Sequence, residues 1–323
     1  MFTLDQLEAA AALVYRHMPP TPQYAWPLLA EATGVELWVK HENHTPAGAF
    51  KIRGGLVYVD RLRRTRPDVR AIVTATRGNH GQSLALAGSR AGLAVTIVVP
   101  ESNSAEKNAL MRAFGAEVVA VGRDFDAARE AARAIAERQG ALMVPSFDPA
   151  LVLGVATYAL EFFRHAGPLD TVYVPIGLGS GICGLIRTRD LLGLSTEIVG
   201  VVAAGAPAYR LSFEAGRVIA TERALTFADG MACRVPEPDA LAIIQQGAAR
   251  VLELDEAAIA AAVRLYFGAT HNVAEGAGAA PLAALLQERA AMAGKRVGLI
   301  LCGGNIDTDK FACVLAGGVP KPF

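Results

Sequence analysis

Short apolar runs, many of them rich in β-branched residues, alternate with alanine-rich stretches through most of the 323-residue chain. These runs are almost continuously apolar, which is typical of strands that are buried on both faces of a sheet. We expect strands at 35–40, 71–74, 95–99, 117–121, 141–144, 171–175, 197–203 and 296–302. The alternation of strands and helices predicts an α/β fold with parallel sheets covered by helices.

The stretches between the runs carry helix signals. Residues 124–139 are rich in alanine, begin with an acidic residue and end before a glycine, as helices commonly do. A second helix is expected over 83–90. Near the N-terminus, four apolar side chains share one helical face: Leu4, Leu7, Ala11 and Val14. No repeat and no Pro/Ser-rich linker divides the chain, although its length predicts two lobes, so we expect the lobes to be interleaved.

Composition and charge narrow the class of protein. Hydrophobic residues make up 52% and charged residues 19%, and the 31 basic residues equal the 31 acidic ones. Such a chain is globular, and it lacks the basic excess that binding to nucleic acid or an anionic membrane requires. Its four cysteines show no zinc-ligand spacing, so we expect reduced thiols and no metal site.

The N-terminal ten residues contain acids and no basic region, so they do not resemble a signal peptide. No run of about 18 apolar residues suggests a membrane span. A cytoplasmic location is the expectation.

Lys51 is the first candidate for chemistry. It lies between Phe50 and Ile52, after a segment rich in Thr, Pro and Gly. Apolar neighbours can remove an amine from water, which lowers its pKa and favours the neutral nucleophile that forms a Schiff base. A surface lysine is the more common case, and this motif alone favours it.

A second candidate segment follows the run at 71–74. Residues Thr76–His80 join this expected strand to the expected helix at 83–90. Backbone N–H groups at such a turn can bind a carboxylate, and Arg77 and Asn79 add side-chain donors. An ordinary connecting loop explains the pattern equally well.

A glycine-rich segment follows the run at 171–175. Gly177, Gly179 and Gly181 alternate there, and this spacing lets a backbone wrap an anion at the start of a helix. The segment does not match the nucleoside-triphosphate loop. It partly matches the dinucleotide fingerprint, with Glu197 near the expected acid position, so a nucleotide-binding oxidoreductase remains open at this point.

Two late segments complete the candidate set. Cys302–Asn305 end the last apolar run with a thiol, two glycines and an amide, and ligands of open α/β sheets bind at such strand ends. A plain turn is the alternative. The segment 271–278 is predicted to start a helix, with Glu275 and His271 as possible site residues, and helix capping explains it equally well.

Together, the order and spacing of these motifs resemble fold-type II pyridoxal-5′-phosphate (PLP) enzymes, which are tryptophan synthase β-like. The resemblance is closest to the threonine/serine dehydratase, or ammonia-lyase, branch, and it extends from about Pro22 to Asp307. It implies two three-layer α/β lobes with the cofactor between them. Residues 1–53 plus 149–323 would form the large lobe, and 54–148 the small inserted lobe. A cytoplasmic homodimer or homotetramer is also implied.

The resemblance assigns roles to individual residues. Lys51 would bind PLP covalently and move the Cα proton, Phe50 would pack near the ring, Asn79 would hydrogen-bond the phenolic oxygen, and Cys302 would face the pyridine nitrogen. The phosphate would bind Gly177, Leu178, Gly179, Ser180 and Gly181. The amino-acid substrate would bind Thr76, Arg77, Gly78, Asn79 and His80. Glu275 and His271 would line the site.

The implied reaction is β-elimination from L-threonine or L-serine, giving a 2-oxo acid and ammonia. A neutral Cys302 makes the ring a weak electron sink, so prompt loss of a β-leaving group is favoured. Arg77 stands where racemases of the family have a serine, which argues against racemisation. At 203–207 the acid of metal-dependent relatives is missing, so no metal is expected.

Other activities stay open within this resemblance. The motifs also resemble a catabolic sub-branch that includes phenylserine dehydratase-like and hydroxyectoine-utilisation dehydratase-like proteins, which act on bulkier substrates. A β-replacement synthase and a non-catalytic PLP-binding regulator are further alternatives.

Overall fold

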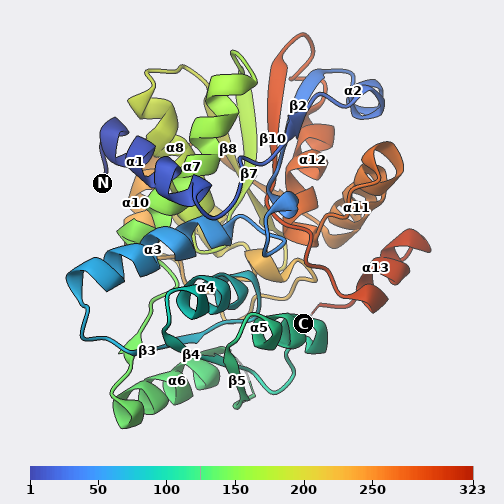
Figure 1. The fold of residues 1–323 in the computed structure, drawn as a ribbon. Coiled ribbons are helices and arrows are strands. Elements are labelled where there is room, and N and C mark those ends of the chain that lie inside the picture. The colour runs from blue at the N-terminus through green and yellow to red at the C-terminus, as the bar shows by residue number, and fades with distance from the viewer. Residues whose placement is uncertain (124, 323) are drawn as a thin grey trace.

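The computed structural model describes residues 1–123 and 125–322, apart from the side chain of Asp126. It contains two separate sheets (Figure 1). The larger sheet has six strands in the order β1-β2-β10-β7-β8-β9, parallel except for the antiparallel β1–β2 pair. Their bounds are β1 (Gln23–Tyr24), β2 (Glu36–His41), β10 (Arg296–Leu301), β7 (Thr171–Pro175), β8 (Glu197–Ala203) and β9 (Arg250–Leu254).

The smaller sheet is entirely parallel, in the order β5-β4-β3-β6. Its strands are β5 (Glu117–Ala120), β4 (Ala94–Val99), β3 (Ala71–Ala75) and β6 (Leu142–Met143). Neighbouring residues on β3 face opposite sides: Ile72 packs in a core with α4 (Asn79–Arg90), and Val73 packs with α6 (Phe125–Gln139). Helices therefore cover both faces of this sheet (Figure 1).

The larger sheet is covered in the same way. Val172 on β7 lies on the same face of the sheet as Phe162 of α7, and both approach Gly298 of β10. On the opposite face, the hydroxyl of Tyr173 donates to Glu288 of α12. The helices of this region are α1 (Leu4–Tyr15), α2 (Pro27–Thr33), α7 (Pro149–His165), α8 (Ser180–Leu191), α9 (Ala208–Ala215), α10 (Pro238–Gly247), α11 (Glu256–Thr270), α12 (Gly276–Glu288) and α13 (Thr308–Leu315), with the short 3₁₀ turns η1 (Glu42–His44) and η2 (Asp229–Met231). The predicted α/β fold with two sheets is confirmed.

The eight expected strands are present within one or two residues of their predicted bounds. The sequence analysis missed β1 and β9. The edge strand β9 is only partly buried and carries Arg250 and Glu253, so it lacks a continuous apolar run.

One of the predicted helices begins elsewhere in the structure, and the predicted start of another cannot be compared. The helix expected over 83–90 begins earlier, at Asn79, because the buried first turn is too polar to show an apolar pattern. The start predicted at Asp124 lies outside the described residues. None of the described helices combines the length and apolarity that a membrane span requires.

The two remaining helices are α3 (Lys51–Thr65) and α5 (Ala105–Ala113). Helix α3 packs between α7 and α4. Close contact needs glycine on both sides: a Cβ on Gly54 would lie 2.8 Å from the carbonyl oxygen of Leu151 in α7, and a Cβ on Gly55 would collide with Ser83 in α4. Helix α3 therefore contacts a helix of each predicted lobe. The lobe boundary predicted between residues 53 and 54 stays a prediction.

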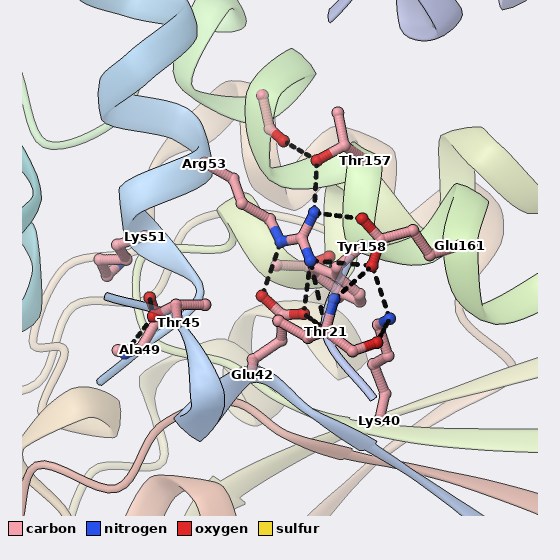
Figure 2. A network of polar contacts seen from close by, with 12 residues as sticks. Thr21, Lys40, Glu42, Thr45, Ala49, Lys51, Arg53, Thr157, Tyr158 and Glu161 are labelled. Atoms are coloured by element: carbon pink, nitrogen blue, oxygen red, sulfur yellow. Dashed lines mark hydrogen bonds and ion pairs between the residues drawn. The ribbon is translucent and has the colours of Figure 1, made fainter. Parts of the chain in front are cut away.

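A fully buried ion network fixes the start of α3 (Figure 2). The guanidinium of Arg53 donates to both carboxylate oxygens of Glu42 (2.8 and 3.0 Å) and to both of Glu161 (2.6 and 2.9 Å). Lys40 also binds Glu161, at 2.6 Å. Two cations thus face two anions. Arg53 also donates to the hydroxyl groups of Thr157 and Thr21, and the Thr21 hydroxyl donates to Glu42.

Charge pairing keeps Arg53 and Glu161 ionised. Burial alone would lower the pKa of Arg53, but Glu42 and Glu161 raise it above its usual value. Burial likewise opposes ionisation of Glu161, but Arg53 and Lys40 hold the pKa of this carboxyl below its usual value. Such a network is stable only while every member is present, because a lone buried charge is costly.

We expect Glu161→Ala to lower the free energy of unfolding by about 3–5 kcal/mol, because it leaves Lys40 and one side of Arg53 unpaired in the interior. Urea denaturation measures the loss. The matched control is Asp60→Asn, which removes the exposed partner of Arg64 on α3 and should cost at most about 0.5 kcal/mol. Equal effects of the two substitutions would contradict this account of the network.

Candidate active site

Lys51 is the first residue of α3, and the loop before it is bonded to the end of β10. The amide of Phe50 donates to the carbonyl of Cys302 at 2.9 Å, and the amide of Gly304 donates to Gly48 at 2.9 Å. These backbone bonds place the lysine, the aromatic ring and the thiol next to one another, although Lys51 and Cys302 are far apart in the sequence. In Figure 2, Lys51 lies on the opposite side of α3 from the Arg53 guanidinium.

Lys51 is only partly exposed, and its amine lies 4.9 Å from the centroid of the Phe50 ring. Its removal from water lowers its pKa, and this effect outweighs the opposing attraction of Cys302 and Glu275. A larger fraction of neutral amine makes a better nucleophile and base. A cavity is lined by Lys51, Gly54, His80, Ser146, Leu151, Val155 and Ser180.

The glycine-rich segment lies between β7 and the start of α8, as predicted. Gly179 has a φ of 98°, and a Cβ there would lie 2.7 Å from the Cβ of Ala240. A Cβ on Gly177 would collide with the carbonyl oxygen of Gly230 in η2. The backbone can therefore take this path only with glycine, and the free N–H groups of the first turn of α8 are available to an anion.

Phe50 and Cys302 line a second small cavity between this loop and β10. Its lining is Phe50, Tyr158, Val174, Pro175, Gly181, Ile300 and Cys302. Tyr158 packs edge-on against Phe50, with centroids 6.2 Å apart, and donates to the carbonyl of Gly181 at 2.9 Å. Burial raises the pKa of Cys302 well above its usual value, so this thiol is neutral.

The predicted substrate segment lies at the end of β3 and in the first turn of α4. The amide of Gly78 donates to the side chain of Thr76 at 3.1 Å. His80 is buried beside Lys51, and burial, followed by the charge of Lys51, lowers its pKa to about 3, so the imidazole is neutral. Arg77 is half-buried, and it forms no hydrogen bond or ion pair with the described part of the chain.

An amide network joins this segment to the rest of the site. The side-chain amide of Asn305 donates to Asn79 at 2.9 Å and to Gln82 at 2.7 Å. Asn79 in turn donates to Oε1 of Glu275 at 2.8 Å. Residues that follow β3, β10 and α11 therefore meet at one point.

Of the two possible site residues, the structure brings one into the cluster. Glu275 is buried and contacts Asn79, but His271 is exposed and packs against Phe267. The helix predicted to start at His271 begins instead at Gly276, because His271 has a φ of 54° and ends α11. Within residues 1–123 and 125–322, His271 forms no hydrogen bond or ion pair with the other predicted site residues.

Several residues that the structure brings to the site carry no recognisable sequence motif. Lys107 and Asp229 form an ion pair beside Gly78, and Ser146 and Tyr158 line the cavities. Their partners are distant in the chain, so no local motif marks them. Asn305 lies within the late Cys-Gly-Gly-Asn segment, and that motif was the available signal.

The residues assembled at this site have the chemical groups that PLP requires. The cofactor carries a phosphate for the glycine loop, an aldehyde for a neutral lysine, and a pyridine nitrogen that a neutral thiol can face. The dinucleotide alternative does not fit, because Glu197 is the first residue of β8 and pairs with Arg250, at the far end of the parallel strands from the glycine loop. No group of three potential metal ligands occurs in the described part of the chain.

Comparison with known proteins supports this interpretation. The family model described as "Pyridoxal-phosphate dependent enzyme" matches residues 14–303. The L-threonine ammonia-lyase of Geobacter sulfurreducens is 36% identical over 292 residues, which cover 90% of this chain and 72% of the relative. The β-hydroxyaspartate dehydratase of Paracoccus denitrificans is 32% identical over 311 residues, covering 95% and 98% of the two chains.

A solved structure has the same fold. The processed form of threonine deaminase isoform 2 from Solanum lycopersicum superposes with a TM-score of 0.88 at 27% identity, and the match covers 98% of this chain and 94% of that protein. The family model spans most of the chain. This chain belongs to the family of pyridoxal-phosphate dependent enzymes, of fold type II, and its cofactor is PLP.

Proposed function

We propose that this protein is an ammonia-lyase that removes the β-hydroxyl group from a β-hydroxy-α-amino acid of the L-threonine or L-serine type, giving a 2-oxo acid and ammonia. The observation that carries the proposal is the environment of Lys51, whose amine has a lowered pKa and lies beside the glycine loop. The names of the similar proteins, L-threonine ammonia-lyase and β-hydroxyaspartate dehydratase, support the same reaction class.

In this proposal the residues of the chain hold the cofactor in place. When bound, PLP supplies the electron sink for reaction at Cα. Lys51 would bind it covalently and move the Cα proton, Phe50 would pack against the ring, Asn79 would donate to the phenolic oxygen and Cys302 would face the pyridine nitrogen. The phosphate-binding backbone consists of Gly177, Leu178, Gly179, Ser180 and Gly181.

The substrate carboxylate is assigned to Thr76–His80. The first turn of α4 presents its N–H groups there, and the helix dipole favours a negative charge at this end. His80 is neutral because of its burial, so it contributes shape and hydrogen bonding without adding a charge. The buried surroundings exclude water, which strengthens each of these polar contacts.

Three further features stay predictions from the resemblance. They are the division into a large lobe (1–53 and 149–323) and a small lobe (54–148), assembly as a homodimer or homotetramer, and a cytoplasmic location.

Lys51→Ala should abolish ammonia release and the absorbance of the bound cofactor, because no other amine of the described residues lines the cavity. The measurement is ammonia release by the purified protein from L-threonine, L-allo-threonine, L-serine, D-serine, L-threo-phenylserine and β-hydroxyaspartate. Production of a 2-oxo acid without an added thiol separates elimination from β-replacement. A protein that binds the cofactor yet releases no ammonia from any of these compounds would contradict the proposal.

A second candidate substrate is favoured by Arg77. This arginine is half-buried next to the carboxylate-binding turn and has no anionic partner among the described residues. A substrate with a second carboxylate, such as β-hydroxyaspartate, would provide one, and guanidinium groups bind carboxylates through paired hydrogen bonds. Three similar proteins are named for hydroxyaspartate.

If Arg77 binds a side-chain carboxylate, Arg77→Ser should lower kcat/KM for β-hydroxyaspartate roughly ten- to hundredfold, the value of one charge-assisted interaction. The kcat/KM for L-threonine should change little. Steady-state kinetics with both substrates measures the ratio. A similar loss with both substrates would instead assign Arg77 to the α-carboxylate that they share.

A further inference from the structure

Glu275 occupies a fixed position between the predicted partners of the cofactor ring. It precedes the first turn of α12 and is only 2% exposed. Its amide donates to the carbonyl of Gly303 at 3.1 Å, which ties it to the end of β10. Its side chain contacts Asn79, assigned to the phenolic oxygen, and Cys302, assigned to the pyridine nitrogen.

The two oxygens of this carboxyl group have different surroundings. Oε1 accepts a hydrogen bond from Asn79 at 2.8 Å and lies 3.9 Å from the thiol of Cys302, which can also donate. Oε2 is buried and has no hydrogen-bond partner within residues 1–123 and 125–322. In a neutral carboxylic acid, the oxygen that accepts from donors is the carbonyl oxygen, so the proton belongs on Oε2. A buried O–H without an acceptor is costly unless a ligand provides one.

The titratable groups around Glu275 come from other elements. Lys51 lies on α3, Lys107 on α5 and Asp229 on η2, while the neutral thiol of Cys302 follows β10. Lys107 and Asp229 are paired with each other, so their effects on Glu275 largely oppose one another.

The balance of these effects raises the pKa of Glu275 and so extends the pH range of the protonated form. Burial has the largest effect and raises the pKa of Glu275 to about 7. Asp229 acts in the same direction, against Lys107, the Asn79 hydrogen bond and Lys51.

We propose that Glu275 works as a neutral carboxylic acid, whose Oε2 proton is donated in a hydrogen bond to the phenolic oxygen of the bound cofactor. This inference rests on the proposed ring contacts of Asn79 and Cys302. Because a neutral Cys302 cannot stabilise a positive pyridine nitrogen, the chain supplies its strong proton donor at the neighbouring edge of the ring. Glu275 thus strengthens the electron sink without transferring its proton, and no further reactant is needed.

The direct test is infrared difference spectroscopy of the holoenzyme. Wild type minus Glu275→Gln should show the carbonyl band of a protonated carboxyl group at pH 6, and the band should disappear as the pH rises through the pKa of Glu275. The matched control is Glu288→Gln. The Glu288 carboxylate is paired with Arg250, which helps to hold its pKa below the usual value although burial opposes this, so its difference spectrum should lack the band. Absence of the band for Glu275 would overturn the proposal.

The second test leaves Glu275 in place, so it applies even if Glu275→Gln cannot bind the cofactor. The absorbance of the bound cofactor should change with pH as Glu275 ionises. Asp229→Asn removes a negative neighbour and should lower the midpoint, whereas Lys107→Met removes a positive one and should raise it, each by roughly one pH unit.

Midpoints that stay fixed, or that move in the same direction, would overturn the role of Glu275. Neither test requires turnover. Failure of this inference is therefore distinct from failure of the ammonia-lyase proposal, which depends on ammonia release through Lys51.

Discussion

The ion network around Arg53 is the constraint on which the position of the active lysine depends. One guanidinium binds two carboxylates on both of its edges, and these come from the turn after β2 and from α7. Because two buried anions balance two buried cations, no single element can move without leaving a charge unpaired in the interior. Lys51 lies two residues before Arg53 on the same helix, so the network orients the start of α3 as well as stabilising it.

Packing of α3 connects this constraint to the rest of the site. Gly54 and Gly55 bring the helix close to α7 on one side and to α4 on the other. The same helix therefore contacts α4, which begins at Asn79, and α7, which in turn packs against α8 after the glycine loop. Lys51 and Gly54 of this helix line the cavity together with Ser180 of α8. On the side of the site formed by the residues after β10 and α11, Asn305 donates to Asn79, and Asn79 donates to Glu275.

Burial has opposite consequences in these two places. In the Arg53 network every charge has a partner, so Arg53 and Glu161 stay ionised although they are removed from water. Around Lys51 the buried groups lack such pairing, and burial shifts the pKa of His80, Glu275 and Cys302 toward the neutral forms. A low-dielectric interior thus provides a rigid ionic support beside a cluster of neutral donors and acceptors suited to proton chemistry at a bound ring.

Local sequence patterns were sufficient for the eight apolar strands and for the four motifs at their ends, because strand burial and turn chemistry depend on neighbouring residues. They did not reveal β9, whose charged residues suit a sheet edge, or the start of α4 at Asn79. Nor could they show that Glu275 accepts from Asn79, 196 residues away, or that Lys107 pairs with Asp229. Only the tertiary structure decides such contacts, because they depend on how two sheets pack around α3 and leave no periodicity in the sequence.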